Sequence, residues 1–295
     1  MASLKEVRNR IVSVNSTQQI TKAMKMVAAA KLRRAQDNII QMRPYAQKLG
    51  EMLSTVASSG AEFASESPLK QQRPVEKVLM VLVTSDRGLC GAFNTNVIKG
   101  AMSRIESAYA QQAAAGNVEV LAIGKKGAEG MLRRGFKVNT QYMGLFTNLS
   151  FENVKKAGEE IMDAFTDKKY DVVELVYNQF KNVATQVVNT ENYLPIAAEG
   201  DSDGKGTANT NYIFEPSESE ILEELIPKSL KIQLYRAVLE SNASENGARM
   251  TAMDKATENA QELLKDLKLV YNRSRQASIT NEILEIVGGA EALAR

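Results

Sequence analysis

A hydrophobic repeat of 3.5 residues at both ends of the chain constrains its fold more than any other feature. The repeat runs from Leu4 to Val56 near the start and from Ile221 to Gly288 near the end. Apolar residues at this spacing line one stripe of an α-helix, and a repeat sustained over many heptads is typical of a coiled coil. Neither helix can bury its stripe alone, so we expect the two ends to pair as antiparallel helices.

The two stripes can be listed residue by residue. The first consists of Leu4, Val7, Ile11, Val14, Gln18, Thr21, Lys25, Ala28, Leu32, Ala35, Ile39, Met42, Ala46, Leu49, Leu53 and Val56. The second consists of Ile221, Leu225, Lys228, Ile232, Tyr235, Leu239, Asn242, Asn246, Arg249, Met253, Ala256, Ala260, Leu263, Leu267, Val270, Ser274, Ala277, Asn281, Leu284 and Gly288. Pro44 and Pro227 predict local kinks, because proline removes a backbone hydrogen bond. Polar residues within the stripes either set the register of the pair or face other proteins.

Between the helical ends, the pattern changes to that of an α/β domain. Short runs rich in β-branched residues predict strands at 77–84, 118–123, 171–180, 185–194 and, at an edge, 212–214. Helical patterns alternate with them at 94–114, 125–134 and 150–167, with Ser150 placed to cap the last. The stretch 59–74, of Ser, Gly, Glu, Gln and Pro, predicts a connector, and the Gly-, Ser- and Asp-rich stretch 199–211 predicts a mobile loop.

This alternation predicts a doubly wound, mostly parallel sheet with helices on both faces, so the fold class is α/β with an added long antiparallel coiled coil. The predicted division has three parts. Residues 1–60 form an N-terminal coiled-coil helix, residues 75–214 a central Rossmann-like domain, and residues 217–295 a C-terminal coiled-coil helix.

Composition argues against several kinds of chemistry. Histidine is absent, which removes the commonest general base and metal ligand. The single cysteine, Cys90, has no partner for an internal disulfide. The chain shows neither a signal-peptide pattern nor an apolar run of about 20 residues that could span a bilayer. We therefore expect no cofactor, no metal site and no catalytic residue, in a cytoplasmic protein.

Three features leave a chemical alternative open. The loop Thr84–Gly91 lies between a strand and a helix, where phosphate-binding loops occur, but its glycine spacing matches no nucleotide motif and favours a tight turn. Asp86 in this loop is a possible magnesium ligand without a second carboxylate. Cys90 is either a reactive thiol or, as its type favours, a small buried residue.

The start of the chain is also basic. Residues 1–43 carry nine Lys and Arg against Glu6 and Asp37, and the basic face includes Lys22, Lys25, Lys31, Arg33 and Arg34. Aromatic residues for base stacking are missing there, so a solvated face or a protein contact is favoured and no nucleic-acid partner is expected.

Two segments resemble the signatures of a known family. Gln18–Ala29, which reads QQITKAMKMVAA, and Tyr271–Glu282, which reads YNRSRQASITNE, resemble the N- and C-terminal signatures of the gamma subunit of F-type ATP synthases. Ser85–Gly91, SDRGLCG, is similar to the central-domain motif of that family. The bacterial type is implied, because the chain lacks a transit peptide. It also lacks the cysteine-pair insertion of chloroplast relatives, so no redox gating is expected.

The resemblance implies a non-catalytic rotor shaft. It implies that the paired helices turn inside a hexamer of three alpha and three beta subunits, and that proton flow through the membrane ring of c subunits drives ATP synthesis at the beta subunits. The implied partners are the alpha, beta and epsilon subunits and the c-ring, so that membrane contact is indirect. The implied location is the cytoplasmic face of the bacterial inner membrane, as a peripheral protein.

The resemblance also implies contact or coupling roles for particular residues. These are Met24, Lys25, Arg249, Arg275, Gln276, Thr280, Glu282 and Glu285. Met24 matches the point where the shaft passes a lever segment of beta, and Arg275 and Gln276 match residues that meet a catch loop of beta. Lys25 departs from the family pattern, because relatives can carry an acidic residue there. We expect the residues near Met24 and those near Arg275 to lie close together.

Two functions of other classes stay open from the sequence. One is a static coiled-coil scaffold that holds partners without turning. The other is an enzyme that uses the α/β domain, for which tight magnesium-dependent nucleotide binding would be the sign.

Overall fold

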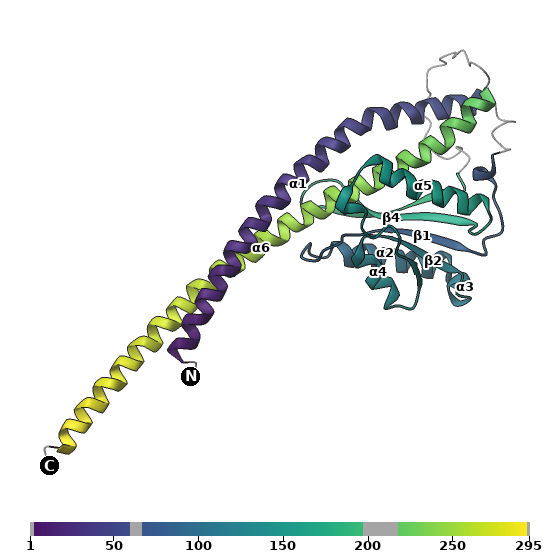
Figure 1. Ribbon diagram of the computed structural model, residues 1–295. Helices are drawn as coiled ribbons and strands as arrows, with labels where there is room; N and C mark the ends of the chain where they lie inside the picture. The colour runs from purple at the N-terminus through teal and green to yellow at the C-terminus, as the bar shows by residue number, and fades with distance from the viewer. Residues whose placement is uncertain (1–2, 60–66, 197–217, 294–295) are drawn as a thin grey trace. The chain divides into compact units, whose positions relative to one another are not determined.

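The computed structural model describes residues 3–59, 67–196 and 218–293 (Figure 1). Two long helices, α1 (Leu4–Ser59) and α6 (Glu218–Leu293), precede and follow a five-stranded sheet along the chain. The chain divides into two compact units. We call Met1–Ala28 with Met250–Arg295 the two-helix unit, and Ala29–Arg249 the α/β unit. Each long helix contributes to both units, and the predicted three-part division of the chain stays a prediction.

The predicted stripe of α1 is confirmed from Leu4 to Leu49, and its last two positions, Leu53 and Val56, lie outside the described side chains. From Leu4 to Leu49, every stripe position is buried or half-buried, whereas nearly all residues between them are exposed. The helix also continues through Pro44, so this proline does not end it. The stripe could be read correctly because α1 carries a single set of apolar residues at heptad spacing.

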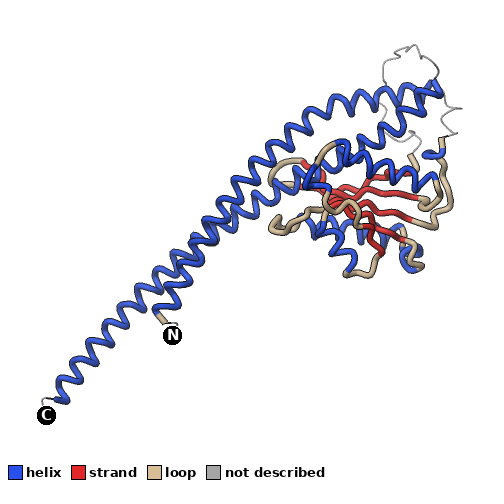
Figure 2. Tube along the Cα trace, in the orientation of Figure 1, coloured by secondary structure: helices blue, strands red, loops and turns tan. Residues whose placement is uncertain are grey.

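In the two-helix unit, α6 runs antiparallel to α1 as expected. Lys25 contacts Asp254 and Thr21 contacts Thr257, so residue numbers rise along one helix as they fall along the other. Figures 1 and 2 show the N-terminal part of α1 alongside α6, and the C-terminal residues of α6 continue beyond it.

Part of the predicted α6 stripe is wrong in this unit. The buried residues are Met253, Ala260, Leu264 and Leu267, whereas Leu263 and Val270 are 39% and 46% exposed. From Met253 the prediction takes a step of three residues and then one of four, whereas the buried stripe takes a step of four and then one of three. Every second predicted position is therefore off by one residue. Leu263-Leu264 and Val270-Tyr271 each place an apolar residue at both candidate positions, so the sequence fits either order of steps. Packing against α1 selects the second residue of each doublet.

The sheet is mostly parallel, as predicted. Its strand order is β3-β2-β1-β4-β5. The strands are β1 (Val78–Val83), β2 (Val118–Ile123), β3 (Lys137–Asn139), β4 (Val172–Phe180) and β5 (Gln186–Leu194). All neighbours are parallel except β5, which runs antiparallel to β4. The edge strand β3 was not predicted, because its three residues are too few to carry a pattern. The strand predicted at 212–214 and most of the loop predicted at 199–211 lie outside the described residues.

The helices between the strands follow the prediction with one interruption. They are α2 (Phe93–Ala108), α3 (Ala110–Ala114), α4 (Lys125–Leu132) and α5 (Phe151–Thr166), with short 3₁₀ turns at Pro68–Lys70 and Leu145–Asn148. The stretch predicted as one helix over 94–114 is divided at Tyr109, which is buried and donates its hydroxyl to Glu174 at 2.7 Å. Ser150 caps α5 as predicted, accepting from the backbone N–H of Asn153.

Apolar side chains of alternate residues in β1, β2 and β4 pack on opposite faces of the sheet. Helices cover both faces (Figure 2). One face of β1 packs with α2 and α4 and the other with α5 and α6. The residues of α6 that join this second core are Ile226, Leu230, Leu234, Ala237 and Val238. The first part of α6 is therefore a core helix of the α/β unit.

Candidate partner-contact surfaces

Polar residues in the seam of the two-helix unit bind each other across the helices. The Nζ of Lys25 donates to Oδ1 of Asp254 at 2.5 Å, and the side chains are 38% and 45% exposed. One turn away, Oγ1 of Thr257 donates to Oγ1 of Thr21 at 2.8 Å. Such contacts are satisfied in only one register, so these polar positions set which residues of α1 and α6 face each other.

Beside this seam, α1 exposes apolar side chains around Met24. Met24 is half-buried, whereas Ile20 and Val27 are 59% and 57% exposed. Ile20, Met24 and Val27 follow one another at steps of four and three residues, which places them on one helical face. Ile20 and Val27 were not predicted as contact residues, although they are apolar and lie just off the α1 stripe.

The other expected contact residues lie on the distal part of α6. Arg275, Gln276, Thr280, Glu282 and Glu285 are all exposed. The hydrogen bonds found for them stay within one helical turn, such as the bond from Oγ1 of Thr280 to the carbonyl oxygen of Gln276 at 2.9 Å. Their outer surfaces are thus open to another molecule.

The same segment exposes many large apolar side chains. Ile279, Ile283, Leu284, Ile286 and Val287 are 48% to 71% exposed. At 100° per residue they fall within about half of the helix circumference, so they form one broad apolar face. Exposed apolar surface of this kind marks an interaction site.

The expectation that the surroundings of Met24 and Arg275 lie together is wrong. Lys25 faces Asp254, so Met24 lies level with this part of α6. Arg275 follows about 20 residues later, which corresponds to about 30 Å along a helix. The stripes alone could not show this, because a heptad pattern allows pairings offset by whole heptads.

Arg249 lies apart from the exposed group, as the last residue of the α/β unit. Its Nη2 donates to the carbonyl oxygens of Arg87 and Gly88 at 3.1 and 3.2 Å, and its Nη1 donates to Oε1 of Glu245. Burial raises the pKa of the Glu245 carboxyl despite the neighbouring Arg249.

The loop Thr84–Gly91 is a tight turn held by its own side chains. Oγ of Ser85 donates to the carbonyl oxygen of Arg87 at 2.7 Å. Oδ1 of Asp86 accepts from the backbone N–H of Lys125 at 3.2 Å, so Asp86 holds the N-terminus of α4. Among the residues that the structure describes, no group of three or more His, Cys, Asp or Glu is arranged to hold a metal ion.

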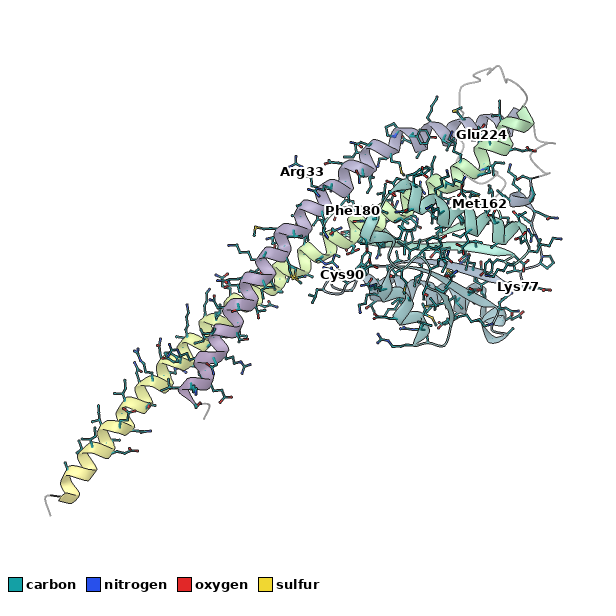
Figure 3. All side chains as sticks on the ribbon, viewed as in Figure 1. Arg33, Lys77, Cys90, Met162, Phe180 and Glu224 are labelled. Carbon is teal, nitrogen blue, oxygen red and sulfur yellow. The ribbon has the colours of Figure 1, made fainter. Side chains whose placement is uncertain are left out.

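Cys90 is the small buried residue that its type favours (Figure 3). The amide nitrogen of Asn94 donates to its sulfur at 3.2 Å. Burial raises the pKa of the thiol, so the unreactive thiol form dominates at neutral pH.

Helix α6 covers the carboxyl edge of the sheet. Oγ of Ser241 donates to the carbonyl oxygen of Val83 at 3.4 Å, and Oγ of Ser244 donates to that of Asn178 at 3.0 Å. In doubly wound folds, ligands bind outside this edge where the strand order reverses. Here α6 side chains lie against it, between the ends of β1 and β4.

Two further expectations concern the surface. Lys22, Lys31, Arg33 and Arg34 are exposed, whereas Lys25 is half-buried in its pair with Asp254. None of the helices, over the residues described, is both long enough and apolar enough to cross a membrane.

Comparisons with known proteins agree with these features. The family model described as ATP synthase matches residues 3–293. The ATP synthase gamma chain of Cytophaga hutchinsonii is 60% identical over 294 residues, and that of Flavobacterium johnsoniae is 55% identical over 293 residues, each covering 99% of both chains.

Solved structures share the fold. A chain of the Tetrahymena thermophila mitochondrial ATP synthase central stalk and c-ring is 25% identical, with a TM-score of 0.58, and the match covers 80% of this chain and 99% of that one. A chain of the Euglena gracilis mitochondrial ATP synthase is 22% identical, with a TM-score of 0.66 and coverage of 98% and 94%.

Proposed function

Since the chain belongs to the ATP synthase gamma-chain family, we propose that it is the central rotor shaft of a bacterial F1Fo ATP synthase. It turns inside a hexamer of alpha and beta subunits and couples proton flow through the c-ring to ATP synthesis at the beta subunits. It binds the epsilon subunit and the c-ring at its other end, and it carries no catalytic residue itself.

The observation that carries this proposal is the distal part of α6. Helical residues from Asn281 to Ala290 are all exposed, although Ile283, Leu284 and Ile286 are among them. An exposed apolar face of this kind marks a surface that another protein covers. A sleeve formed by the ends of the alpha and beta subunits fits that requirement.

The polar residues of this segment give the contact its specificity. Arg275, Gln276, Thr280, Glu282 and Glu285 are exposed and are free to meet successive beta subunits. A shaft shifts the equilibrium of a beta subunit only by the difference in its contact free energy between the states of that subunit. Exposed polar contacts are weak enough to be exchanged at each step.

Near the start of α1, Met24 and its exposed neighbours Ile20 and Val27 form a second surface for the beta subunits. Lys25 contributes less to it, because Asp254 of the same chain holds its ammonium group. A relative with an acidic residue at this position would lose that internal pair.

The α/β unit offers little support for a catalytic role. At the carboxyl edge of its sheet, Ser241 and Ser244 of α6 bind backbone carbonyls where a nucleotide would approach. We place the protein at the cytoplasmic face of the inner membrane, held there through the c-ring.

The test is rotation in a reconstituted complex. Alpha and beta subunits of the same species are assembled with the chain and fixed to a surface, and a bead is attached to Lys156→Cys in a Cys90→Ser background. Lys156 is exposed on α5, and Cys90 is buried. ATP should drive continuous one-way rotation of the bead.

Three results would contradict the proposal. A bead that binds but does not turn would indicate a static scaffold. Alpha and beta subunits that assemble without the chain and show unchanged sustained hydrolysis would exclude the shaft. Tight magnesium-dependent ATP binding by the chain alone would favour an enzyme.

A further inference from the structure

The hydrogen bonds of the Arg249 side chain all go to acceptors within the same chain. Its guanidinium binds the backbone of Arg87 and Gly88 and the carboxylate of Glu245. The side chains of Arg249 and Glu245 are only 13% and 14% exposed. A side chain covered to this extent has little surface left with which to contact a partner subunit.

Arg249 completes a series of α6 side chains that bind backbone carbonyls. Ser241 binds the last residue of β1, Ser244 binds Asn178 of β4, and Arg249 binds the loop after β1. The three donors span about two turns of α6. They attach this stretch of α6 to the carboxyl edge of the sheet immediately before the helix leaves the α/β unit at Arg249.

The loop that Arg249 binds has a conformation that needs support. Leu89 has a φ of 64°, in the left-handed region that residues other than glycine rarely adopt, and its side chain is 65% exposed. Leu89 directly follows Gly88, whose carbonyl oxygen accepts from Arg249. Since the exposed Leu89 side chain contributes little packing, hydrogen bonds to the neighbouring carbonyls hold the loop: Arg249 donates to those of Arg87 and Gly88, and Oγ of Ser85 also donates to that of Arg87.

We propose that Arg249 is a positioning residue for torque transfer, and that its role in coupling is internal. Together with Ser241 and Ser244 it joins α6 to the sheet edge, so that the α/β domain and this part of α6 turn as one body. The same position that binds ligands in other doubly wound folds serves here as a mechanical joint. This inference rests on the proposed shaft function.

The functional test compares two activities of the assembled enzyme carrying Arg249→Ala. Hydrolysis by the catalytic head alone needs no torque through the joint, whereas proton-driven synthesis by the whole complex does. Loss of charged hydrogen bonds to two carbonyls should lower synthesis about tenfold, and hydrolysis by no more than about twofold. Lys255→Ala is the matched control, because Lys255 is an exposed cation six positions further along α6.

Equal losses of both activities, or unchanged synthesis, would overturn the inference. Failure of the proposed function would give a different result: the unmodified chain would support neither activity, and the shaft assignment itself would fail. Arg249→Lys keeps the charge but not the forked guanidinium, so synthesis should recover only in part.

A second measurement does not depend on activity. A spin label is placed at Leu89→Cys in the Cys90→Ser background, and its mobility is recorded in the assembled complex. Mobility should rise when Arg249→Ala is added and should not change with Lys255→Ala. Circular dichroism confirms that each chain is folded, and a label whose mobility is unaffected by Arg249→Ala would show that Arg249 does not hold the loop.

Discussion

The two halves of helix α6 differ in their surroundings although they form one continuous helix. From Ile226 to Arg249, every side chain except Lys228 is buried or half-buried, because core residues and hydrogen bonds attach this half to the α/β domain. The side chains from Met250 to Asp254 are still buried or half-buried. From Lys255 onward only a stripe facing α1 is covered, and beyond Ser278 all described side chains are exposed as far as Ala290.

This difference separates two uses of apolar residues. In the first half, apolar side chains stabilise the fold, because burial removes them from water within the chain. In the distal half, equally apolar side chains such as Ile283 and Leu284 contribute little to folding of the free chain and are available to a partner. Substitutions in the two halves should therefore affect different measurements.

The largest expected effect compares two leucines of α6. Leu234→Ala leaves a cavity in a core where Leu234 is 0% exposed, which should lower the free energy of unfolding by about 3 kcal/mol. Leu284→Ala, at a side chain 63% exposed, should change it by less than about 0.5 kcal/mol. Urea unfolding of the free chain, followed by tyrosine fluorescence, measures both. Equal changes in the free energy of unfolding for the two variants would show that the two halves of α6 do not differ in their contribution to stability.

Arg275→Ala should show the reverse behaviour. Arg275 is exposed in the free chain, so the free energy of unfolding should change by less than about 0.5 kcal/mol. Loss of an arginine contact to the beta subunits should lower coupled ATP synthesis about tenfold. Lys268→Ala, an exposed cation one heptad earlier, is the control and should leave synthesis unchanged. A parallel loss of stability and synthesis in Arg275→Ala would contradict a contact role.

A smaller effect should appear in the pH dependence of stability. Burial raises the pKa of Glu245 above its ordinary value of 4.5, so between that value and the folded-state pKa the folded chain binds more protons than the unfolded chain. The contribution of Glu245 therefore falls as pH rises through this window. The free energy of unfolding, measured with urea at several pH values in this window, should decrease less with pH in Glu245→Gln. Glu258→Gln, at an exposed position, should not alter this pH dependence.

The smallest effect concerns the seam of the two-helix unit. A double-mutant cycle on Lys25→Ala and Asp254→Ala should give a coupling of about 0.5 kcal/mol or less, because both side chains are more than one-third exposed. Thermal unfolding by circular dichroism measures it. A control cycle pairs Asp254→Ala with Lys5→Ala, about 30 Å away along α1, and should be additive. Coupling in the control as large as in the pair would refute a direct contact.

Much of the fold was predictable because its signals are local. The stripe of α1, four of the five strands and the cap at Ser150 follow from spacing and residue type within short windows. The edge strand β3 was not predictable, because three residues are too few to show an alternating pattern. The break at Tyr109 was missed because its cause is a hydrogen bond to Glu174, which lies 65 residues away.

For the candidate sites, the sequence indicated which residues to consider but not what each side chain contacts. The resemblance placed Arg249 and Arg275 in one group of contact or coupling residues, yet Arg249 is bound inside the α/β unit and Arg275 is exposed. It also marked Lys25 as unusual without showing Asp254 as its partner. Residue type alone did not separate these cases, because an arginine or lysine can serve either purpose.

Periodicity in the sequence is enough to predict that two amphipathic helices flank a mostly parallel α/β domain, because it records which residues must leave water. The register of the helix pair and the order of steps along the α6 stripe depend on tertiary contacts. These contacts also decide which part of α6 belongs to the core of the α/β unit. The physical reason is that several registers bury similar apolar area, so the choice among them depends on contacts between residues far apart in the chain.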